Sequence, residues 1–401
     1  MTRRSLLMAL ACLACLRAED FAAQRAKALA LGELTAAPAV HAAEGYDSTA
    51  GLKAIFFDGP PWKGKPTRVF AWLGLPERKD GAKVSGVVLV HGGGGTAFRE
   101  WVEKWTARGY AAIAIATEGQ TDQAEETAKG RAWKRQPWGG PARDKIFADS
   151  GEPLEDQWIY QAVAQTVLAN SLLRSLPEVD AEKVGVMGIS WGGVVTSTVI
   201  GIDPRFAFAI PTYGCGHLFD AANQWGAALG DNQTYRQVWD PMVRMARVKT
   251  PTLWLSWPQD NHFPLDCQAA CYRSAPGPHM VALIPGMRHS HPAGWAPPDS
   301  YAFADSIVQT GRPWLEQTAF ETSGGEAQVS FRSAKPLDRA LLVWTKDTGF
   351  TGTRDWIEAP AALTEQGHHW RVTATVPREA TAWFVSVRSG DLTASSDYQE
   401  R

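Results

Sequence analysis

One serine in this chain is placed where its hydroxyl could act as a nucleophile. Ser190 follows a short apolar run at residues 184–187 and has a glycine two positions away on either side, Gly188 and Gly192. This order predicts a strand, a sharp turn and a helix, with the hydroxyl exposed at the start of the helix. Glycines are needed there because a side chain would clash with the neighbouring strand and helix. The next amide, on Trp191, would then point at a developing oxyanion.

A serine hydroxyl needs a base within hydrogen-bond reach, and a carboxylate to orient that base. Asp260 comes just after an apolar run at residues 252–257, and His289 just after another at residues 279–284. Both therefore follow predicted strands, as Ser190 does, in the chain order serine, acid, histidine. The pattern predicts a triad of Ser190, Asp260 and His289.

Three nearby side chains leave alternatives open. His291 lies two residues after His289 and is the alternative base; His289 is preferred because it follows the strand more directly. Asp266 is the alternative acid, but it falls inside the following predicted helix. His262, beside the acid, is expected at the rim of the site.

A glycine run supplies a candidate second oxyanion donor. The apolar residues 84–90 predict a buried strand that ends in His91 and four glycines. An amide of Gly93 or Gly94 would face the site opposite Trp191. A phosphate-binding loop is not indicated, because the run lacks GxGxxG spacing and no Lys-Ser/Thr pair follows it.

The elements around these residues alternate between strand and helix, which predicts a largely parallel sheet covered on both faces, with the site at the carboxyl ends of the strands. Two antiparallel strands, at residues 52–57 and 67–75, are expected to precede it. The polar stretch 118–154 is expected to be a long loop. The remaining strands are expected at 84–90, 110–116, 206–212, 252–257 and 279–284, and helices at 98–107, 154–176, 264–273 and 301–310.

The two ends of the chain differ from this pattern. Residues 1–18 combine Arg3 and Arg4 with a short apolar run and are typical of a signal peptide, of a kind similar to twin-arginine export signals. The mature protein would be periplasmic or extracellular and would have no membrane span. Residues 322–401 contain short alternating strands and predict a small immunoglobulin-like β-sandwich after a catalytic domain at 50–315. The sandwich would bind substrate or brace the catalytic domain.

Composition narrows the function further. With 40 basic and 42 acidic residues, the chain has no cationic surplus that would indicate nucleic acid. No spacing typical of a metal site occurs, and neither a metal nor a cofactor is expected. After the leader, Cys215, Cys267 and Cys271 remain; one bridge from Cys215 to either of the others would leave the third thiol free.

The motifs GISWGG and HGGGG, with the loops that carry Asp260 and His289, resemble the α/β-hydrolase superfamily. The resemblance covers residues 50–315 and is nearest to dienelactone-hydrolase-like, acetyl-xylan-esterase-like and prolyl-oligopeptidase-like proteins. It implies an α/β-hydrolase fold and hydrolysis through an acyl-enzyme on Ser190, with Asp260 as the acid and His289 as the base. Dienelactone hydrolases have a cysteine at the position of Ser190, which favours a general esterase here.

Four tryptophans, which fall in predicted rim loops, are candidates to stack on a sugar or aryl group: Trp133, Trp138, Trp257 and Trp295. The leading hypothesis is an exported serine esterase for acyl esters, including O-acetylated carbohydrate. The alternatives are a serine peptidase for short peptides and, from another class, a glycan-binding protein that keeps a hydrolase scaffold without activity.

Overall fold

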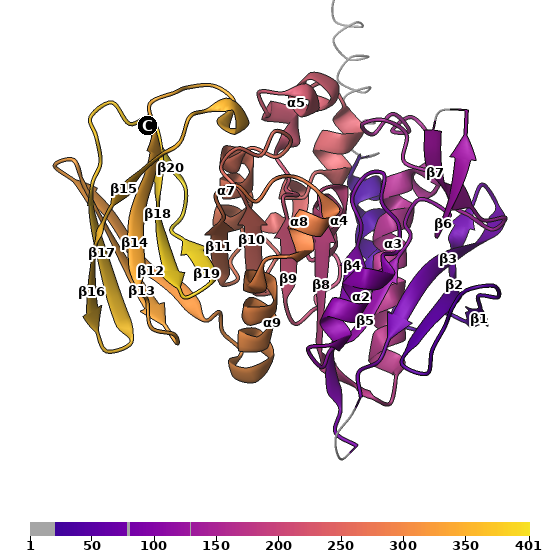
Figure 1. Ribbon diagram of the computed structural model, residues 1–401. Coiled ribbons are helices and arrows are strands. Elements are labelled where there is room, and N and C mark those ends of the chain that lie inside the picture. Colours follow the sequence, from indigo (N-terminus) through magenta and orange to yellow (C-terminus); the bar gives the residue numbers. More distant parts are fainter. Residues whose placement is uncertain (1–20, 78–80, 129) are drawn as a thin grey trace, which may run out of the picture.

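A parallel sheet forms the centre of the computed structural model, which describes residues 21–77, 81–128 and 130–401. Six strands run parallel in the order β5-β4-β8-β9-β10-β11, and most of their residues are buried, as the apolar runs predict; the exposed residues lie in the first half of β8. The mostly parallel sheet with helices is confirmed (Figure 1). The strands are β4 (Val84–Val90), β5 (Ala111–Ile115), β8 (Val179–Ile189), β9 (Ala209–Thr212), β10 (Thr252–Ser256) and β11 (His279–Leu283).

An antiparallel extension flanks β5. β3 pairs with β5, β2 with β3, and β1 with β2, all antiparallel. The two expected strands are confirmed, and both are longer than predicted: the glycine and two prolines at residues 59–61 belong to β2 and do not form the turn. The chain reverses at Lys63 and Gly64, whose φ angles of 49° and 73° suit a tight turn. The strands are β1 (Val40–Ala42), β2 (Leu52–Trp62) and β3 (Lys65–Gly74).

Helices pack against the sheet in two groups. α3 contacts α4 and strands β4, β5 and β8, while α2 meets α9 where Trp105 packs on Tyr301 at 4.7 Å between ring centroids. Each of these helices buries apolar side chains, and the helices expected between the strands are therefore confirmed. The main helices are α2 (Arg99–Thr106), α3 (Trp158–Ser175), α4 (Trp191–Val199), α7 (Leu265–Ser274), α8 (His291–Trp295) and α9 (Pro298–Thr310).

Short helices fill the connections. The segment between β9 and β10 lies over the end of the sheet near α4, with α5 at the surface (Figure 1). Residues 21–29 form a further helix at the beginning of the described chain. The short elements are η1 (Ala30–Glu33), η2 (Leu154–Asp156), η3 (Leu218–Asp220), α5 (Gln224–Leu229), η4 (Tyr235–Trp239) and α6 (Met242–Met245).

The polar stretch expected as a loop contains a β-hairpin. β6 (Gln120–Thr127) pairs with β7 (Gly130–Arg135) and stands apart from the main sheet. Only the first residues of β6, Gln120 and Thr121, are buried. Most of the hairpin faces water, so its sequence lacks the apolar alternation that reveals a half-buried strand.

The C-terminal strands form two antiparallel sheets, and one of them continues the central sheet. β19 pairs with β11 through Val281 and Ser395, and β18, β14 and β15 follow outward (Figure 1). A second sheet, in the order β12-β13-β17-β16, packs against this extension. The strands are β12 (Leu315–Ser323), β13 (Glu326–Ser333), β14 (Arg339–Thr345), β15 (Ile357–Pro360), β16 (Ala362–Gln366), β17 (His369–Thr375), β18 (Ala382–Ser389), β19 (Leu392–Ser395) and β20 (Gln399–Glu400), and η5 (Thr351–Thr353) follows β14.

The expected division of the chain remains a prediction. β12 already belongs to the second sheet and begins at Leu315, earlier than residue 322. At the other end, β1 pairs with β2 before residue 50. The expected signal peptide, residues 1–18, lies outside the described residues.

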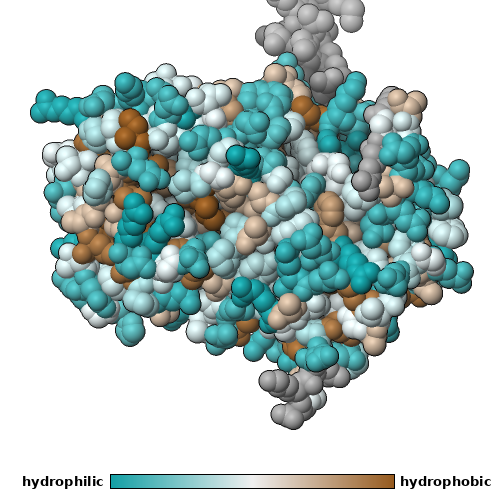
Figure 2. Space-filling model, viewed as in Figure 1, coloured by the Kyte–Doolittle hydropathy of each residue, from teal (hydrophilic) through white to brown (hydrophobic). Residues whose placement is uncertain are grey.

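The visible surface is mostly hydrophilic, with small scattered hydrophobic patches (Figure 2). Only Val40, Trp138 and Ile357 are large hydrophobic residues exposed to solvent within the described part of the chain. Across the same residues, none of the helices is both long and apolar enough to span a bilayer. Cys215, Cys267 and Cys271 are all buried and free, so neither of the two bridges open to Cys215 is present.

Candidate active site

Ser190 occupies a strained turn between β8 and α4. Its φ and ψ angles are 59° and −118°, a conformation that costs a non-glycine residue free energy. A methyl group at Gly188 would lie 2.0 Å from the carbonyl oxygen of Gly192, and one at Gly192 would lie 2.0 Å from that of Val90. The expected clash with the helix and with the neighbouring strand is therefore confirmed at both glycines.

The glycine run after β4 passes directly beside Ser190. The N–H of Gly95 donates to the carbonyl of Gly92 at 3.1 Å, which closes a tight turn in which Gly94 has a φ of 70°. A methyl group at Gly92 would lie 2.8 Å from the Cβ of Ser190, and one at Gly93 would lie 3.0 Å from the Trp191 ring. The two segments expected to supply oxyanion donors thus meet at the serine.

Trp191 begins α4, so no carbonyl of that helix can accept its N–H. Its indole is 4% exposed and packs edge-on against Trp225 of α5 and Phe147, with centroid distances of 5.1 and 5.6 Å. Trp225 in turn packs on Phe263 at 5.7 Å, in the loop that carries Asp260. An aromatic cluster therefore holds the turn at Ser190 and the acid loop, residues 257–264, in a fixed relation.

Asp260 and His289 form a hydrogen bond. The two residues lie just beyond the carboxyl ends of β10 and β11, and Nδ1 of His289 is 2.8 Å from Oδ2 of Asp260. The carboxylate is 1% exposed and also accepts the N–H groups of His262 and Phe263 at 2.8 and 2.7 Å. The indole N–H of Trp257 donates to it at 3.2 Å. A buried carboxylate with four donors stays in one orientation.

Tyr213 connects the His289 ring to the Ser190 turn. The N–H of Ser190 donates to the carbonyl of Thr212 at 2.9 Å, and the next residue, Tyr213, packs its ring on His289 with centroids 4.4 Å apart. The Tyr213 hydroxyl donates to the carbonyl of Arg288 at 2.5 Å, and burial raises the pKa of Tyr213 well above its usual value. Tyr213 therefore fixes the segment that carries the imidazole.

The alternative base, His291, belongs to a different contact. Its Nε2 accepts the N–H of Gly92 at 2.9 Å, and its ring packs on Phe98 at 4.8 Å. Burial lowers the pKa of His291 to about 4, so the ring is neutral at pH 7. The geometry brings His289, not His291, to Asp260.

His91 supports the glycine run from behind. It is buried, and its Nε2 accepts the N–H of Thr117 at 3.0 Å and lies 3.1 Å from Nε2 of Gln120. Burial lowers the pKa of His91 to about 3. Gln120 also donates to the carbonyl of Gly95 at 2.9 Å, so β6 holds the run in place.

Two further polar candidates, Asp266 and His262, lie outside the Asp260–His289 pair. Asp266 lies in the first turn of α7, and His289 pairs with Asp260 instead. His262 lies beside the imidazole, with ring centroids 4.6 Å apart, and its Nδ1 is 3.0 Å from Nε2 of Gln224. Burial lowers the pKa of His262.

The four tryptophans have different environments. Trp133 is partly exposed and its indole donates to the carbonyl of Gly94 at 2.9 Å. Trp257 binds Asp260, as described above. Trp138 is 45% exposed but packs on Arg68 and Phe56 of the antiparallel strands. Trp295 is 3% exposed and packs on Trp101, so the expectation that it lies at a pocket mouth is wrong.

A cavity of about 630 Å³ borders the glycine run. Trp133, Gly94 and three alanines contribute apolar surface, and Glu118, Gln120 and Arg135 contribute polar groups. Burial raises the pKa of Glu118, and Arg143 opposes that shift from 3.5 Å. An apolar wall with a few polar groups suits a small polar ligand.

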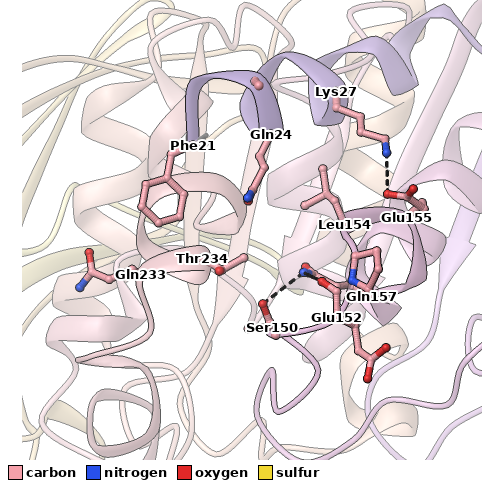
Figure 3. Close-up of a pocket in the computed structure, with 13 residues that line it drawn as sticks. Phe21, Gln24, Lys27, Ser150, Glu152, Leu154, Glu155, Gln157, Gln233 and Thr234 are labelled. Carbon is pink, nitrogen blue, oxygen red and sulfur yellow. Dashed lines mark hydrogen bonds and ion pairs between the residues drawn. The ribbon is translucent and has the colours of Figure 1, made fainter. Parts of the chain in front are cut away.

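A second cavity, of about 750 Å³, lies between the helix at residues 21–29 and the loop before α3 (Figure 3). Lys27 and Glu155 form an ion pair at 2.5 Å along one side of it. None of the residues expected to do chemistry lines it. Within the described residues, no group of three or more His, Cys, Asp or Glu side chains could hold a metal ion.

Several contributors to the site escaped the sequence analysis: Tyr213, Trp225, Gln120 and the Glu118–Arg143 pair. Tyr213 had one detectable signal, because it directly follows a predicted strand and so lies at the same end of the sheet as Ser190. The others lie in segments without periodic patterns.

The family model of acetyl xylan esterase (AXE1) matches residues 18–242, more than half of the chain. The chain belongs to this family. The resemblance stated from the motifs is thereby confirmed. The match includes Ser190 and the glycine run but ends before Asp260 and His289.

Solved structures with the same fold include two acetyl xylan esterases. Acetyl xylan esterase 1 from Thermoanaerobacterium sp. JW/SL YS485 is 18% identical with a TM-score of 0.54, over 68% of this chain and 89% of that one. The acetyl xylan esterase from Paenibacillus sp. R4 is 22% identical with a TM-score of 0.51, over the same shares of 68% and 89%. The α/β-hydrolase fold is therefore confirmed.

A curated relative carries a different name. The uncharacterized peptidase YuxL of Bacillus subtilis (strain 168) is 25% identical over an alignment of 215 residues, and the match covers 49% of this chain. The match spans only 29% of that protein. The family and these relatives together indicate an esterase or a peptidase.

Proposed function

We propose that this protein hydrolyses carboxylic esters through an acyl-enzyme formed on Ser190. The observation that carries the proposal is the 2.8 Å hydrogen bond between buried Asp260 and His289, at the same end of the sheet as the strained Ser190 turn. With Nδ1–H of His289 donating to the carboxylate, Nε2 is unprotonated and can accept the serine proton.

The reaction follows from these roles. Oγ of Ser190 attacks the ester carbonyl carbon, and its proton passes to Nε2 of His289. The carbonyl oxygen becomes an oxyanion, which accepts hydrogen bonds from the main-chain N–H groups of Trp191 and Gly93. The carbon–oxygen bond to the alcohol breaks, and His289 returns the proton to the leaving alkoxide. A water molecule then attacks the acyl-enzyme by the same steps and releases the acid.

Of the two candidate second donors, Gly93 and Gly94, we prefer Gly93, because a methyl group there would lie 3.0 Å from the Trp191 ring, whereas nothing lies within 4 Å of one at Gly94. The amide of Gly92 is already bonded to His291, and Gly93 is the residue that approaches Trp191. Two amides from opposite sides of the serine would stabilise the oxyanion without moving in the reaction.

The substrate we propose is an acetyl ester of a carbohydrate. Membership of the acetyl xylan esterase family supports this class, and so does the cavity beside the glycine run, where Trp133 could stack on a sugar ring. Export, on the strength of residues 1–18, is part of the same proposal, because polymeric carbohydrate lies outside the cell.

A panel of substrates with wild type and Ser190→Ala tests the proposal. We expect turnover of p-nitrophenyl acetate and acetylated xylo-oligosaccharides by wild type, and a loss of at least about a thousandfold in Ser190→Ala. A fluorophosphonate probe should label wild type only. Glycan binding without labelling would instead indicate a non-catalytic protein.

A serine peptidase is the second candidate, favoured by the similarity to YuxL. The same triad would cleave an amide, since attack and proton transfer are shared. Aminoacyl-p-nitroanilides in the same panel separate the two: a clear preference for the anilides over the esters would replace the esterase proposal.

A further inference from the structure

A loop of the C-terminal strands contacts the acid loop. η5 follows β14, and a methyl group at Gly352 would lie 2.1 Å from the carbonyl oxygen of Asp260 and 2.8 Å from its carbonyl carbon. No Cβ fits in this space, so the two backbones pack directly on each other.

Thr351, the residue before, binds the start of α7. Its Oγ1 accepts the N–H of Leu265 at 2.9 Å, and the side chain is 1% exposed. Leu265 is the first residue of α7, where the helix supplies no carbonyl for its N–H. A threonine distant in the chain thus caps the helix that directly follows the acid loop.

The C-terminal residues hold the other end of the same helix. The hydroxyl of Tyr272 accepts the N–H of Tyr398 at 2.9 Å, and Arg273 donates to the carbonyl of Tyr398. The buried Arg354, close to η5, pairs with Glu400 at 2.6 Å. α7 is therefore fixed at both ends by residues beyond position 350.

We propose that Thr351 and Gly352 are positioning residues for the Asp260 carboxylate. This inference rests on the proposed function, in which Asp260 orients His289. The N–H groups that hold the carboxylate come from His262 and Phe263, in the same loop. A displacement of the backbone at residue 260 therefore moves the carboxylate and its donors together, away from the imidazole.

Three substitutions and one matched control test the inference on the full-length protein. Thr351→Val removes the acceptor at nearly constant volume, Thr351→Ser keeps it, and Gly352→Ala pushes on the Asp260 carbonyl. Thr353→Val is the control, because Thr353 lies in η5 but is exposed, and its hydroxyl donates to the nearby carbonyl of Phe350. Each variant is measured for kcat, KM, melting temperature and rate of fluorophosphonate labelling.

We expect kcat and the labelling rate to fall about tenfold to a hundredfold in Thr351→Val and Gly352→Ala, with KM within about twofold of wild type. Thr351→Ser and Thr353→Val should stay within about twofold of wild type. If Gly352→Ala does not fold, the comparison of Thr351→Val with Thr351→Ser still decides. Unchanged kcat in Thr351→Val, beside a dead Ser190→Ala, would overturn the inference and leave the proposed function intact.

A double-mutant cycle separates positioning from general damage. In an Asp260→Asn background the carboxylate that orients His289 is already lost. Adding Thr351→Val should therefore lower kcat by a further factor of less than about two. An equal fold loss in both backgrounds would show that Thr351 acts on the fold and not through Asp260. Wild type without Ser190-dependent labelling would overturn the proposed function, and this inference with it.

Discussion

The main-chain N–H of Gly92 donates to Nε2 of His291 over 2.9 Å, so one of two closely spaced histidines is committed to the glycine run. The other, His289, binds Asp260 at 2.8 Å. α8 begins at His291, and the ring of that residue packs on Phe98 at 4.8 Å between ring centroids. Two histidines that are hard to tell apart in the sequence thus hold opposite sides of one site.

The first prediction concerns these two rings. His289→Ala should lower kcat by about a thousandfold to ten-thousandfold, because the serine loses its base. His291→Ala should lower kcat much less, since it only removes the acceptor of the Gly92 N–H in the glycine run. His291→Gln should recover part of that loss, because the amide oxygen can accept the Gly92 N–H. Kinetics with p-nitrophenyl acetate measure all three, and a larger effect at His291 would reverse the assignment.

The second prediction concerns the Ser190 turn. Gly192→Ala should destabilise the fold by about 1–3 kcal/mol and abolish activity, because the new methyl group meets the Val90 carbonyl at 2.0 Å. Gly151→Ala is the matched control, since open space surrounds that position. Urea denaturation gives the free energies of unfolding, and a fully active Gly192→Ala would contradict the strained turn.

The third prediction is a pH dependence of stability. Burial lowers the pKa of His91 to about 3 and that of His291 to about 4, both from 6.5. Below pH 6.5 these histidines bind protons in the unfolded chain but stay unprotonated in the native protein. The free energy of unfolding therefore falls as the pH drops toward 4. Asp299 acts in the opposite direction, because burial raises its pKa to about 6.

A comparison of variants isolates the histidine contribution. Urea unfolding of wild type and His291→Gln at several values between pH 7 and pH 4 should give a shallower slope for the variant, by up to about one proton. Identical slopes would show that His291 is not held neutral in the native protein.

The fourth prediction distinguishes two of the candidate sugar-binding tryptophans. Trp133→Ala should raise KM for acetylated oligosaccharides by about tenfold and change turnover of p-nitrophenyl acetate little, because only the larger substrate reaches the cavity wall. Trp138→Ala is the control, since that indole stacks on Arg68 instead. Equal effects of the two substitutions on oligosaccharides would remove Trp133 from the binding site.

Much of the scaffold could be predicted, because buried parallel strands are continuous apolar runs and their carboxyl ends lie together. That reasoning placed Ser190, Asp260 and His289 at one end of the sheet. The steric need for Gly188 and Gly192 could be argued from the turn alone, and the structure shows both clashes.

The supporting contacts could not be predicted, because they join segments with no local pattern. Trp225 meets Trp191 from an irregular insertion, and Thr351 reaches Leu265 across 86 positions of sequence. The hairpin β6–β7 also lacked a signal, since solvent covers most of both strands. Such contacts form between segments that are far apart in the sequence, and no fixed residue spacing in a single sequence reveals them.

Because Val281 of β11 pairs with Ser395 of β19, the C-terminal strands cover the edge that β11 would otherwise form in the central sheet. A protein truncated after α9 would leave the backbone N–H and carbonyl groups of β11 open along an apolar strand, a surface that invites self-association. Removal of the C-terminal part would therefore report on aggregation before it reported on substrate binding. Single substitutions along β19 and η5 are the informative route to what this part of the chain contributes.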